Sequence, residues 1–246
     1  MVILGRWKTV RFAALATVAV IALCSCSSQQ EIVISAGGSG TASIDIRLNK
    51  ILVDYVRELA EATGTQDLLP KDSLFDQKEI ERSIAGRPGV SITSISSPDP
   101  ESLNLELSFE HIETFFATEE LLNQTGVLTL SRRAGNTFLR LVLNRQNYGQ
   151  IAGLFPILSH PLVATLGPSE DYEISESEYL EMMVFIFGDA GPTAVQESTI
   201  DIRIVVDGEL VSQRGGTTHG QEVHFQLPLL QVLLLNQPVD YLVVFR

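Results

Sequence analysis

The chain has 246 residues, of which 45% are hydrophobic and 19% charged, with two cysteines and a formal net charge of −13. Such a composition is typical of a globular protein with a sizeable core. It argues against nucleic acid and anionic lipid headgroups as partners, because both require clustered Lys and Arg, and the longest basic run here is Arg132-Arg133.

The first predicted element is a secretion signal. Met1 to Arg11 carries three basic residues, and Phe12 to Leu23 is apolar and uncharged. A membrane-spanning helix needs roughly 20 apolar residues, so this apolar core is too short to span a bilayer. A basic leader, a short apolar core and small residues after it are typical of a cleaved signal peptide, which we predict over residues 1–25.

The apolar core ends in Leu23-Cys24-Ser25-Cys26, which resembles the lipobox of bacterial lipoproteins. In a lipobox a small residue precedes the cysteine that is acylated and becomes the mature N-terminus. Ser25 suits that position before Cys26, whereas Leu23 is too large for it before Cys24. We therefore predict lipidation at Cys26. The alternative is a cleaved signal that leaves a free terminal cysteine.

Lipidation has consequences for the mature chain of about 220 residues. It would keep no free thiol and no disulfide, so the core alone must hold the fold. Loss of the leader's three basic residues takes the net charge to −16. Two or three acyl chains such as palmitate bind a membrane stably where one does not. The expected location is the bacterial cell envelope, on the periplasmic face of a membrane or at the cell surface.

Residues 26–30 are predicted to be a short tether, followed by a single domain over residues 31–246. Glu31 to Ser35 and Ala42 to Leu48 form an expected hairpin around the glycine-rich turn Gly37 to Gly40. These glycines join two strands and no Lys-Ser/Thr follows them, which argues against a phosphate-binding loop.

Two helices are predicted next. Asn49 caps the first, which ends at Gly64, and Asp76, with Glu79 three residues later, caps the second.

Alternation of apolar and polar residues then predicts strands at Gly89 to Ile95 and Leu103 to Phe109. A helix is expected from His111 to Asn123. A second hairpin joins Val127–Ser131 to Asn136–Leu143.

Gly and Pro break the stretch from Asn147 to Pro168 into short turns of helix. Ser175 and Glu178 then form a capping box that opens a longer helix. Its apolar residues recur with helical spacing: Tyr179, Met182, Met183, Ile186 and Phe187.

The C-terminal part has the strongest β pattern. Thr199 to Val206 is predicted to turn at Asp207-Gly208 and return as Glu209 to Gln213. A further strand includes Val223 to Leu227. Val239 to Phe245 is apolar on both faces, which is typical of a strand inside a sheet and not at its edge.

No catalytic or metal-binding pattern is recognisable, so we expect no catalytic residue, metal or cofactor. His219 and His224 lack metal-ligand spacing, and no Gly-x-Ser-x-Gly occurs. Asp171, Glu176 and Glu178 can be read as the acid and base of a glycosidase, but negative charge at a helix N-terminus explains them without chemistry.

The candidate ligand pocket lies on the same helix and includes Met182, Met183, Ile186 and Phe187. Met and Phe side chains adapt to varied acyl or aromatic ligands. The same spacing suits ordinary core packing, and spacing alone does not separate the two interpretations.

The order of the elements resembles the LppM-like bacterial lipoproteins. The resemblance lies in a Gly-Ser-Gly turn before a strand, a second helix ending in Arg87-Pro88-Gly89-Val90, and the Ile204 to Val223 block with Gly215-Gly216. It implies an α+β domain with a curved, mostly antiparallel sheet, several helices packed on one face and no assigned catalytic residue. It also implies contact with lipids or glycolipids. Because the chain stops at Arg246, without the later transmembrane helix that relatives can carry, the expected anchor is Cys26 alone.

Three functional hypotheses follow. The first is a non-enzymatic, lipid-anchored envelope protein that binds an apolar or amphipathic ligand, such as a lipid or glycolipid, or an envelope protein partner. The second is an envelope hydrolase that depends on carboxylates and would need two buried acids with raised pKa values. The third is a structural subunit of an envelope complex, which would expose a large apolar patch.

Overall fold

The computed structural model describes residues 27–64, 73–118, 125–152, 166–169 and 171–246. The predicted signal peptide and Cys26 lie outside these residues. The strands are β1 (Ser27–Ser35), β2 (Gly40–Arg47), β3 (Val90–Ser96), β4 (Ser102–Phe109), β5 (Leu128–Arg133), β6 (Asn136–Leu143), β7 (Thr199–Asp207), β8 (Leu210–Arg214), β9 (Thr217–His219), β10 (Glu222–Pro228) and β11 (Val239–Phe245). The helices are α2 (Lys50–Ala62), α3 (Gln77–Ile84), α4 (Ile112–Thr118), α6 (Arg145–Ala152), α8 (Glu176–Phe187), α9 (Ala190–Gln196) and α10 (Leu229–Leu234).

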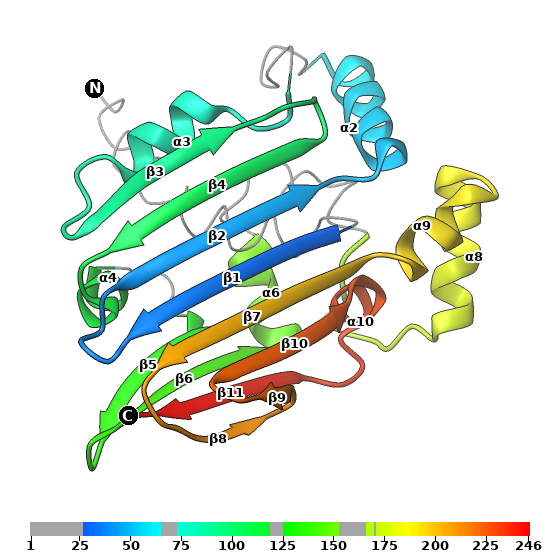
Figure 1. Cartoon of the computed structure of the whole chain (residues 1–246). Coiled ribbons are helices and arrows are strands. Elements are labelled where there is room, and N and C mark those ends of the chain that lie inside the picture. Colours follow the sequence, from blue (N-terminus) through cyan, green and yellow to red (C-terminus); the bar gives the residue numbers. More distant parts are fainter. Residues whose placement is uncertain (1–26, 65–72, 119–124, 153–165, 170) are drawn as a thin grey trace, which may run out of the picture.

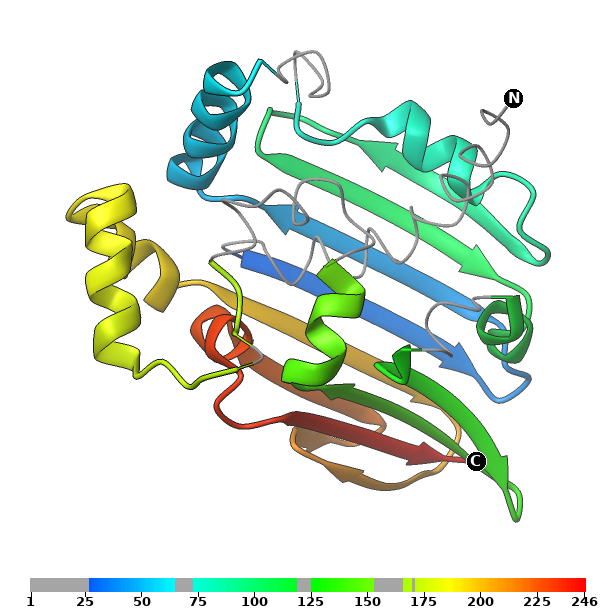
Figure 2. The same ribbon diagram turned by 180° about the vertical axis from the view of Figure 1, so that it is seen from behind.

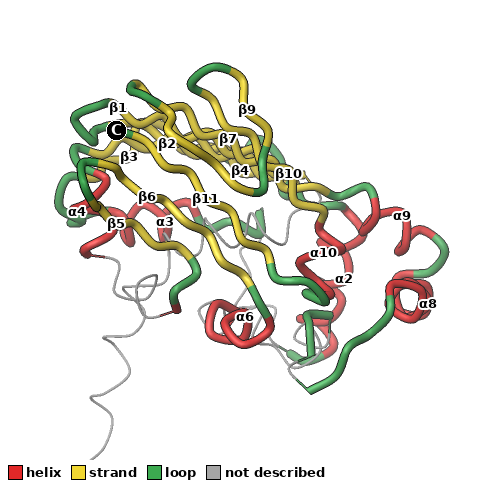
Figure 3. Tube along the Cα trace, turned by 90° about the horizontal axis from the view of Figure 1, so that it is seen from below, coloured by secondary structure: helices red, strands yellow, loops and turns green. Residues whose placement is uncertain are grey.

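The described residues form two mostly antiparallel sheets. The large sheet has seven strands in the order β3-β4-β2-β1-β7-β10-β9, and the small sheet has four in the order β5-β6-β11-β8. In Figure 3 no described helix covers the upper face of the large sheet: the helices lie on its other side or, like α8 and α9, beyond its end. This arrangement confirms the predicted α+β class with a mostly antiparallel sheet and helices packed on one face. Neither sheet closes into a barrel.

Strand β1 differs from its prediction, because it begins at Ser27 and not at Glu31. Ser27 pairs with Arg47 of β2 on one side and with Thr199 of β7 on the other, and the β1–β7 pair is parallel. Ser28 is fully buried. Residues 27–30, predicted to be a loose tether, are therefore the start of a central strand. Their polar side chains give no strand pattern in the sequence. Main-chain hydrogen bonds to the strands on both sides hold them in the sheet.

The predicted N-caps of the first two helices are confirmed. The Asn49 side chain accepts a hydrogen bond from the Ile51 amide at 3.0 Å, and Asp76 accepts one from the Glu79 amide at 3.0 Å. Both caps satisfy amides that have no partner inside their helices.

Two of the predicted hairpins form, β1 with β2 and β5 with β6, and the predicted strands β3 and β4 also pair antiparallel. The tight turn between β5 and β6 has positive φ at both central residues, 50° at Ala134 and 82° at Gly135, as a two-residue hairpin requires.

The predicted hairpin between β7 and β8 is wrong. β7 pairs with β10 in the large sheet, and β8 pairs with β11 in the small sheet. Main-chain hydrogen bonds in both directions join Glu209 to Arg246, and the Arg246 guanidinium also bonds the Glu209 carboxylate. An Asp-Gly pair signals a change of direction but not which strand will be the partner, and here the C-terminal strand is the partner.

Three hydrophobic clusters hold the described part together. The largest lies between the two sheets and includes Ile34, Ile200 and Phe225. A second lies between β4 and α3, where Ile80 and Ile84 are buried as predicted. The third joins α8, α9 and α10.

β11 lies between β6 and β8, which confirms that it is an interior strand. Within the described ranges, no helix has the length and apolar character needed to cross a membrane.

Candidate functional site

The start of β1 marks one end of the large sheet, which we call the helical end because α2, α8, α9 and α10 gather there (Figures 1 and 2). Both strand neighbours of Ser27 lead to these helices. Its partner Arg47 is followed at Lys50 by α2, and its partner Thr199 comes three residues after Gln196, the last residue of α9. Thr199 also pairs with Pro228, the residue before α10.

Helix α8 is held to this end by its own apolar cluster. Tyr179, Met183 and Val195 are buried at its centre, with exposed fractions of 4% or less. The Tyr179 hydroxyl donates a hydrogen bond to the Leu166 carbonyl at 2.7 Å, so the ring's polar end has a partner. Half-buried side chains surround them: Leu166, Ile174, Met182, Ile186, Phe187, Leu230, Leu233 and Leu234.

The structure brings together the four residues of the candidate ligand pocket. Met183 is only 1% exposed and is part of the packed centre, whereas Met182, Ile186 and Phe187 are half-buried around it. The Phe187 ring meets the Tyr55 ring of α2 edge-on, with 5.0 Å between the ring centroids. That contact joins α8 to α2. A ligand at these side chains stays a prediction.

The most exposed large hydrophobic residue of this helix, Phe185, belongs to the apolar cluster noted in the sequence but is not one of the four predicted pocket residues. Phe185 is 89% exposed and the neighbouring Val184 is 43% exposed. Phe185 lies about 200° around the helix from the buried Met183, so it faces away from the cluster. The sequence contained one indication of this exposed apolar side chain. From Tyr179 to Phe187 only Glu181 is polar, and a helix that is apolar on all sides must be buried on all sides.

The acidic residues considered for catalysis do not assemble into a catalytic pair. The Ser175 amide and hydroxyl donate hydrogen bonds to the Glu178 carboxylate at 3.0 and 2.6 Å, which lowers the pKa of Glu178. These bonds complete the predicted capping box. Asp171 and Glu176 are exposed. Among the described residues no Asp or Glu is buried, and every shift resolved for a carboxyl pKa is downward.

His219 and His224 lie elsewhere, on β9 and β10 at one edge of the large sheet. His224 of β10 has its Nε2 3.4 Å from the Asp201 carboxylate, and His219 lies on the neighbouring strand β9. No group of three His, Cys, Asp or Glu side chains that could hold a metal ion occurs in the part of the chain that the structure describes.

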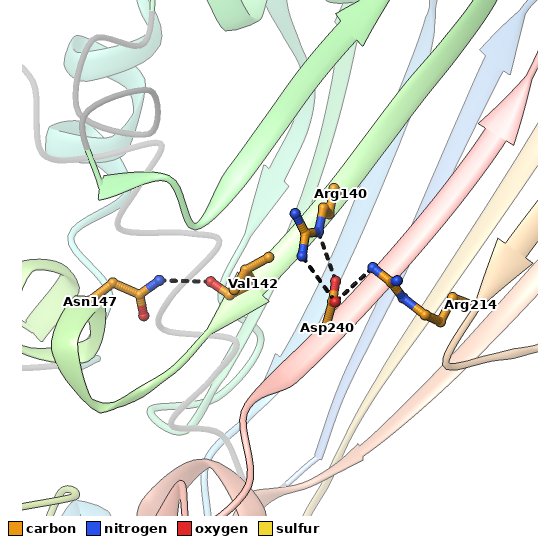
Figure 4. A network of polar contacts seen from close by, with 5 residues as sticks. All are labelled: Arg140, Val142, Asn147, Arg214 and Asp240. Carbon is orange, nitrogen blue, oxygen red and sulfur yellow. Dashed lines mark hydrogen bonds and ion pairs between the residues drawn. The ribbon is translucent and has the colours of Figure 1, made fainter.

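A separate polar network lies on the small sheet (Figure 4). Arg140 donates two hydrogen bonds to the Asp240 carboxylate, at 2.8 and 3.0 Å, and an Arg214 nitrogen lies 2.6 Å from the same carboxylate. The hydrogen bond from Arg140 lowers the pKa of Asp240. Because the three residues come from β6, β11 and β8, the network ties adjacent strands together and has a structural role.

These features define the class of the protein as an α+β domain of two mostly antiparallel sheets, with an apolar helix cluster at one end of the larger sheet. No protein-family model matches the chain, and no curated protein is similar enough to match it. Among solved structures, the folded domain of LppM from Mycobacterium tuberculosis, determined by NMR, aligns with a TM-score of 0.42 and 10% sequence identity. The alignment covers 89% of this chain and 88% of that one. The resemblance is a distant one of structure.

Proposed function

We propose that this chain is a lipid-anchored protein of the bacterial envelope, held at a membrane surface by acyl chains on Cys26. Its domain binds an apolar or amphipathic ligand at that surface and catalyses no reaction. The observation that carries the proposal is the start of β1 at Ser27, directly after the cysteine of the lipobox. With no tether between them, the acyl chains lie at the helical end of the sheet.

The helical end also supports the ligand part of the proposal. Met182, Ile186 and Phe187 are half-buried there around the packed Met183. Met and Phe side chains adapt to acyl chains of different shape. A lipid that leaves the bilayer beside Cys26 would meet this cluster before any other part of the domain.

Charge favours a neutral or zwitterionic lipid, or a glycolipid, over an anionic one. The mature chain has a net charge of −16, and α8 contains three glutamates and no basic residue. Such a surface repels phosphate and carboxylate headgroups. Neutral sugar headgroups avoid this repulsion.

The two alternatives have less support. A carboxylate hydrolase requires two buried acids with raised pKa values, and no described Asp or Glu is buried. A structural subunit of an envelope complex requires an exposed apolar patch. The exposed residues Val184 and Phe185 are the strongest basis for that alternative, and they lie at the helical end.

The anchor is tested by expressing the full chain in a bacterium that processes lipoproteins, together with Cys26→Ala and the matched variant Cys24→Ala. We expect the wild type and Cys24→Ala to lose the leader, gain the mass of the acyl chains and sediment with membranes. Cys26→Ala should remain unacylated. An acylated Cys26→Ala protein, or a free thiol on the wild type, would contradict the proposal.

The ligand is tested by native mass spectrometry of the lipidated protein extracted in mild detergent. We expect a co-purifying lipid that is reduced several-fold in Ile186→Gln, whose side chain is half-buried in the cluster. Val211→Gln, on the distant strand β8, serves as the control because Val211 is exposed. Absence of lipid from the wild type, or equal loss in both variants, would argue against a ligand at this site.

A further inference from the structure

Exposed apolar side chains are concentrated on one helix. The large hydrophobic residues that the described part of the chain exposes are Tyr172, Val184, Phe185 and Val211. Val184 and Phe185 are adjacent in α8, and the Phe185 ring is 89% exposed. An aromatic ring is among the side chains that gain most from leaving water. Two neighbouring exposed residues on a well-packed helix therefore indicate a contact surface.

Helix α8 holds these two side chains in a fixed position. Its first turn is closed by the capping box of Ser175 and Glu178. Its middle is buried at Met183, and its last residue, Phe187, contacts Tyr55 of α2. The side of the helix opposite Met183 consequently faces outward on a helix that packs against the domain at Tyr179, Met183 and Phe187.

The described chain begins at the same end of the large sheet as α8. Cys26 is one residue before Ser27, and consecutive Cα atoms are about 3.8 Å apart. Ser27 is paired on both sides, so the described chain begins at a fixed point of the large sheet. Figures 1 and 2 place the start of β1 and α8 at the same end of the sheet.

We propose that α8 inserts Val184 and Phe185 into the interfacial layer of the same membrane that holds the acyl chains of Cys26. The domain is then fixed in one orientation, with its helical end toward the lipid. This inference rests on the proposed function, because it requires the acyl chains at Cys26. The membrane is neutral or zwitterionic at its surface, since α8 has no basic residue to attract anionic headgroups.

The composition of the chain provides a clean probe. Its single tryptophan, Trp7, leaves with the leader, so the mature protein has none. Phe185→Trp therefore places one indole at the proposed contact, and Val211→Trp places one at an exposed site on β8. Both full chains are lipidated, checked by intact mass and circular dichroism, and reconstituted in phosphatidylcholine vesicles with lipids that carry a quenching doxyl group.

We expect fluorescence quenching in Phe185→Trp to exceed that in Val211→Trp by roughly threefold or more, because interfacial helices lie about 5–10 Å into the headgroup and acyl boundary. Equal, weak quenching of two vesicle-bound, acylated variants would overturn the insertion and leave the anchor intact. Protection of the Phe185→Trp indole only when other envelope proteins are added would assign the surface to a protein partner and also overturn it.

A protein that carries no acyl mass and stays free of vesicles would overturn the proposed function, and the insertion with it.

A second variant tests the insertion with a smaller change to the fold. Val184→Ser changes a side chain that is 43% exposed, and its matched control, Val211→Ser, changes one that is 44% exposed. In the Phe185→Trp background, Val184→Ser should reduce quenching by about twofold or more, as expected for loss of an apolar contact, and Val211→Ser should not. Equal effects of the two would count against insertion.

Discussion

Gly191 of α9 lies directly against the main chain of Met183 in α8. A Cβ atom at position 191 would stand 2.5 Å from the Met183 carbonyl oxygen and 2.9 Å from the Phe187 Cβ. The first of these neighbours is backbone, which cannot rotate out of the way. The close crossing of α8 and α9 therefore depends on a glycine, and so does the position of the outward face of α8.

Gly191→Ala should lower the free energy of unfolding by about 1–3 kcal/mol, as overpacking in a tight contact does. This is expected although Ala has the higher helix propensity. Urea denaturation measures the change. Thr193→Ala, an exposed position of the same helix, should stay within about 0.5 kcal/mol of the wild type. An unchanged midpoint for Gly191→Ala would mean that the two helices separate without cost.

Asp240→Asn should destabilise the small sheet by about 1 kcal/mol at pH 7, because the carboxylate pairs with both Arg140 and Arg214 at its partly exposed surface. The hydrogen bond from Arg140 depresses the pKa of Asp240 in the folded protein. The contribution of Asp240 to the free energy of unfolding is therefore fully present above the pKa of the unfolded carboxyl, about 3.9. It is lost as the pH falls through the lower pKa of the folded protein.

Denaturation curves between pH 7 and pH 2 check this sign. The difference in free energy of unfolding between the wild type and Asp240→Asn should shrink below about pH 4, where the carboxyl of the unfolded chain is protonated. The control is Asp54→Asn, which removes an exposed pair with Lys50 within one helix and should change stability by less than about 0.5 kcal/mol. A difference between wild type and Asp240→Asn that persists undiminished to the lowest pH would refute the ion-pair explanation.

Lipid charge should control the contact of α8 with the bilayer. Replacing phosphatidylcholine by phosphatidylglycerol should reduce quenching of the Phe185→Trp indole at low salt, because Glu176, Glu178 and Glu181 repel the anionic surface. Added salt should restore it, since the Debye length falls to about 8 Å at 0.15 M. Stronger quenching on anionic vesicles would show that charges outside α8 dominate.

The direct connection of Cys26 to β1 predicts that a linker there uncouples anchoring from orientation. Six Gly-Ser residues inserted between Cys26 and Ser27 add a flexible reach of about 13 Å. Membrane sedimentation should be unchanged, and quenching of the Phe185→Trp indole should fall. The same insertion after Gly135, in the exposed turn of β5 and β6, should leave quenching as it was. Equal quenching in both insertions would mean that α8 binds the membrane without help from the anchor.

Much of the fold was predictable from neighbouring residues. Asn49 and Asp76 cap their helices as predicted, and the Ser175 capping box opens α8. The turn at Ala134-Gly135 joins β5 to β6. In each case the signal and the interaction lie within a few residues of each other, so the sequence contains both partners of the contact.

The candidate site was only partly predictable. Helical spacing identified Met183 and its neighbours as one apolar surface, and they do share a cluster. Spacing did not separate the fully buried Met183 from the half-buried Met182, Ile186 and Phe187, because all four belong to the same apolar surface of one helix. Which of them is covered depends on α9 and α10, which come from elsewhere in the chain.

The sequence by itself determined the leader pattern, the acidic charge and the starts of most helices, because these depend on composition or on contacts between residues close in the chain. Only the tertiary structure decided that Ser27 begins a central strand and that β8 pairs with β11. Both facts depend on partners far away, at Thr199 for the first and near Phe245 for the second. Strand pairing is satisfied by main-chain groups that every residue carries, so the side-chain pattern does not specify the partner.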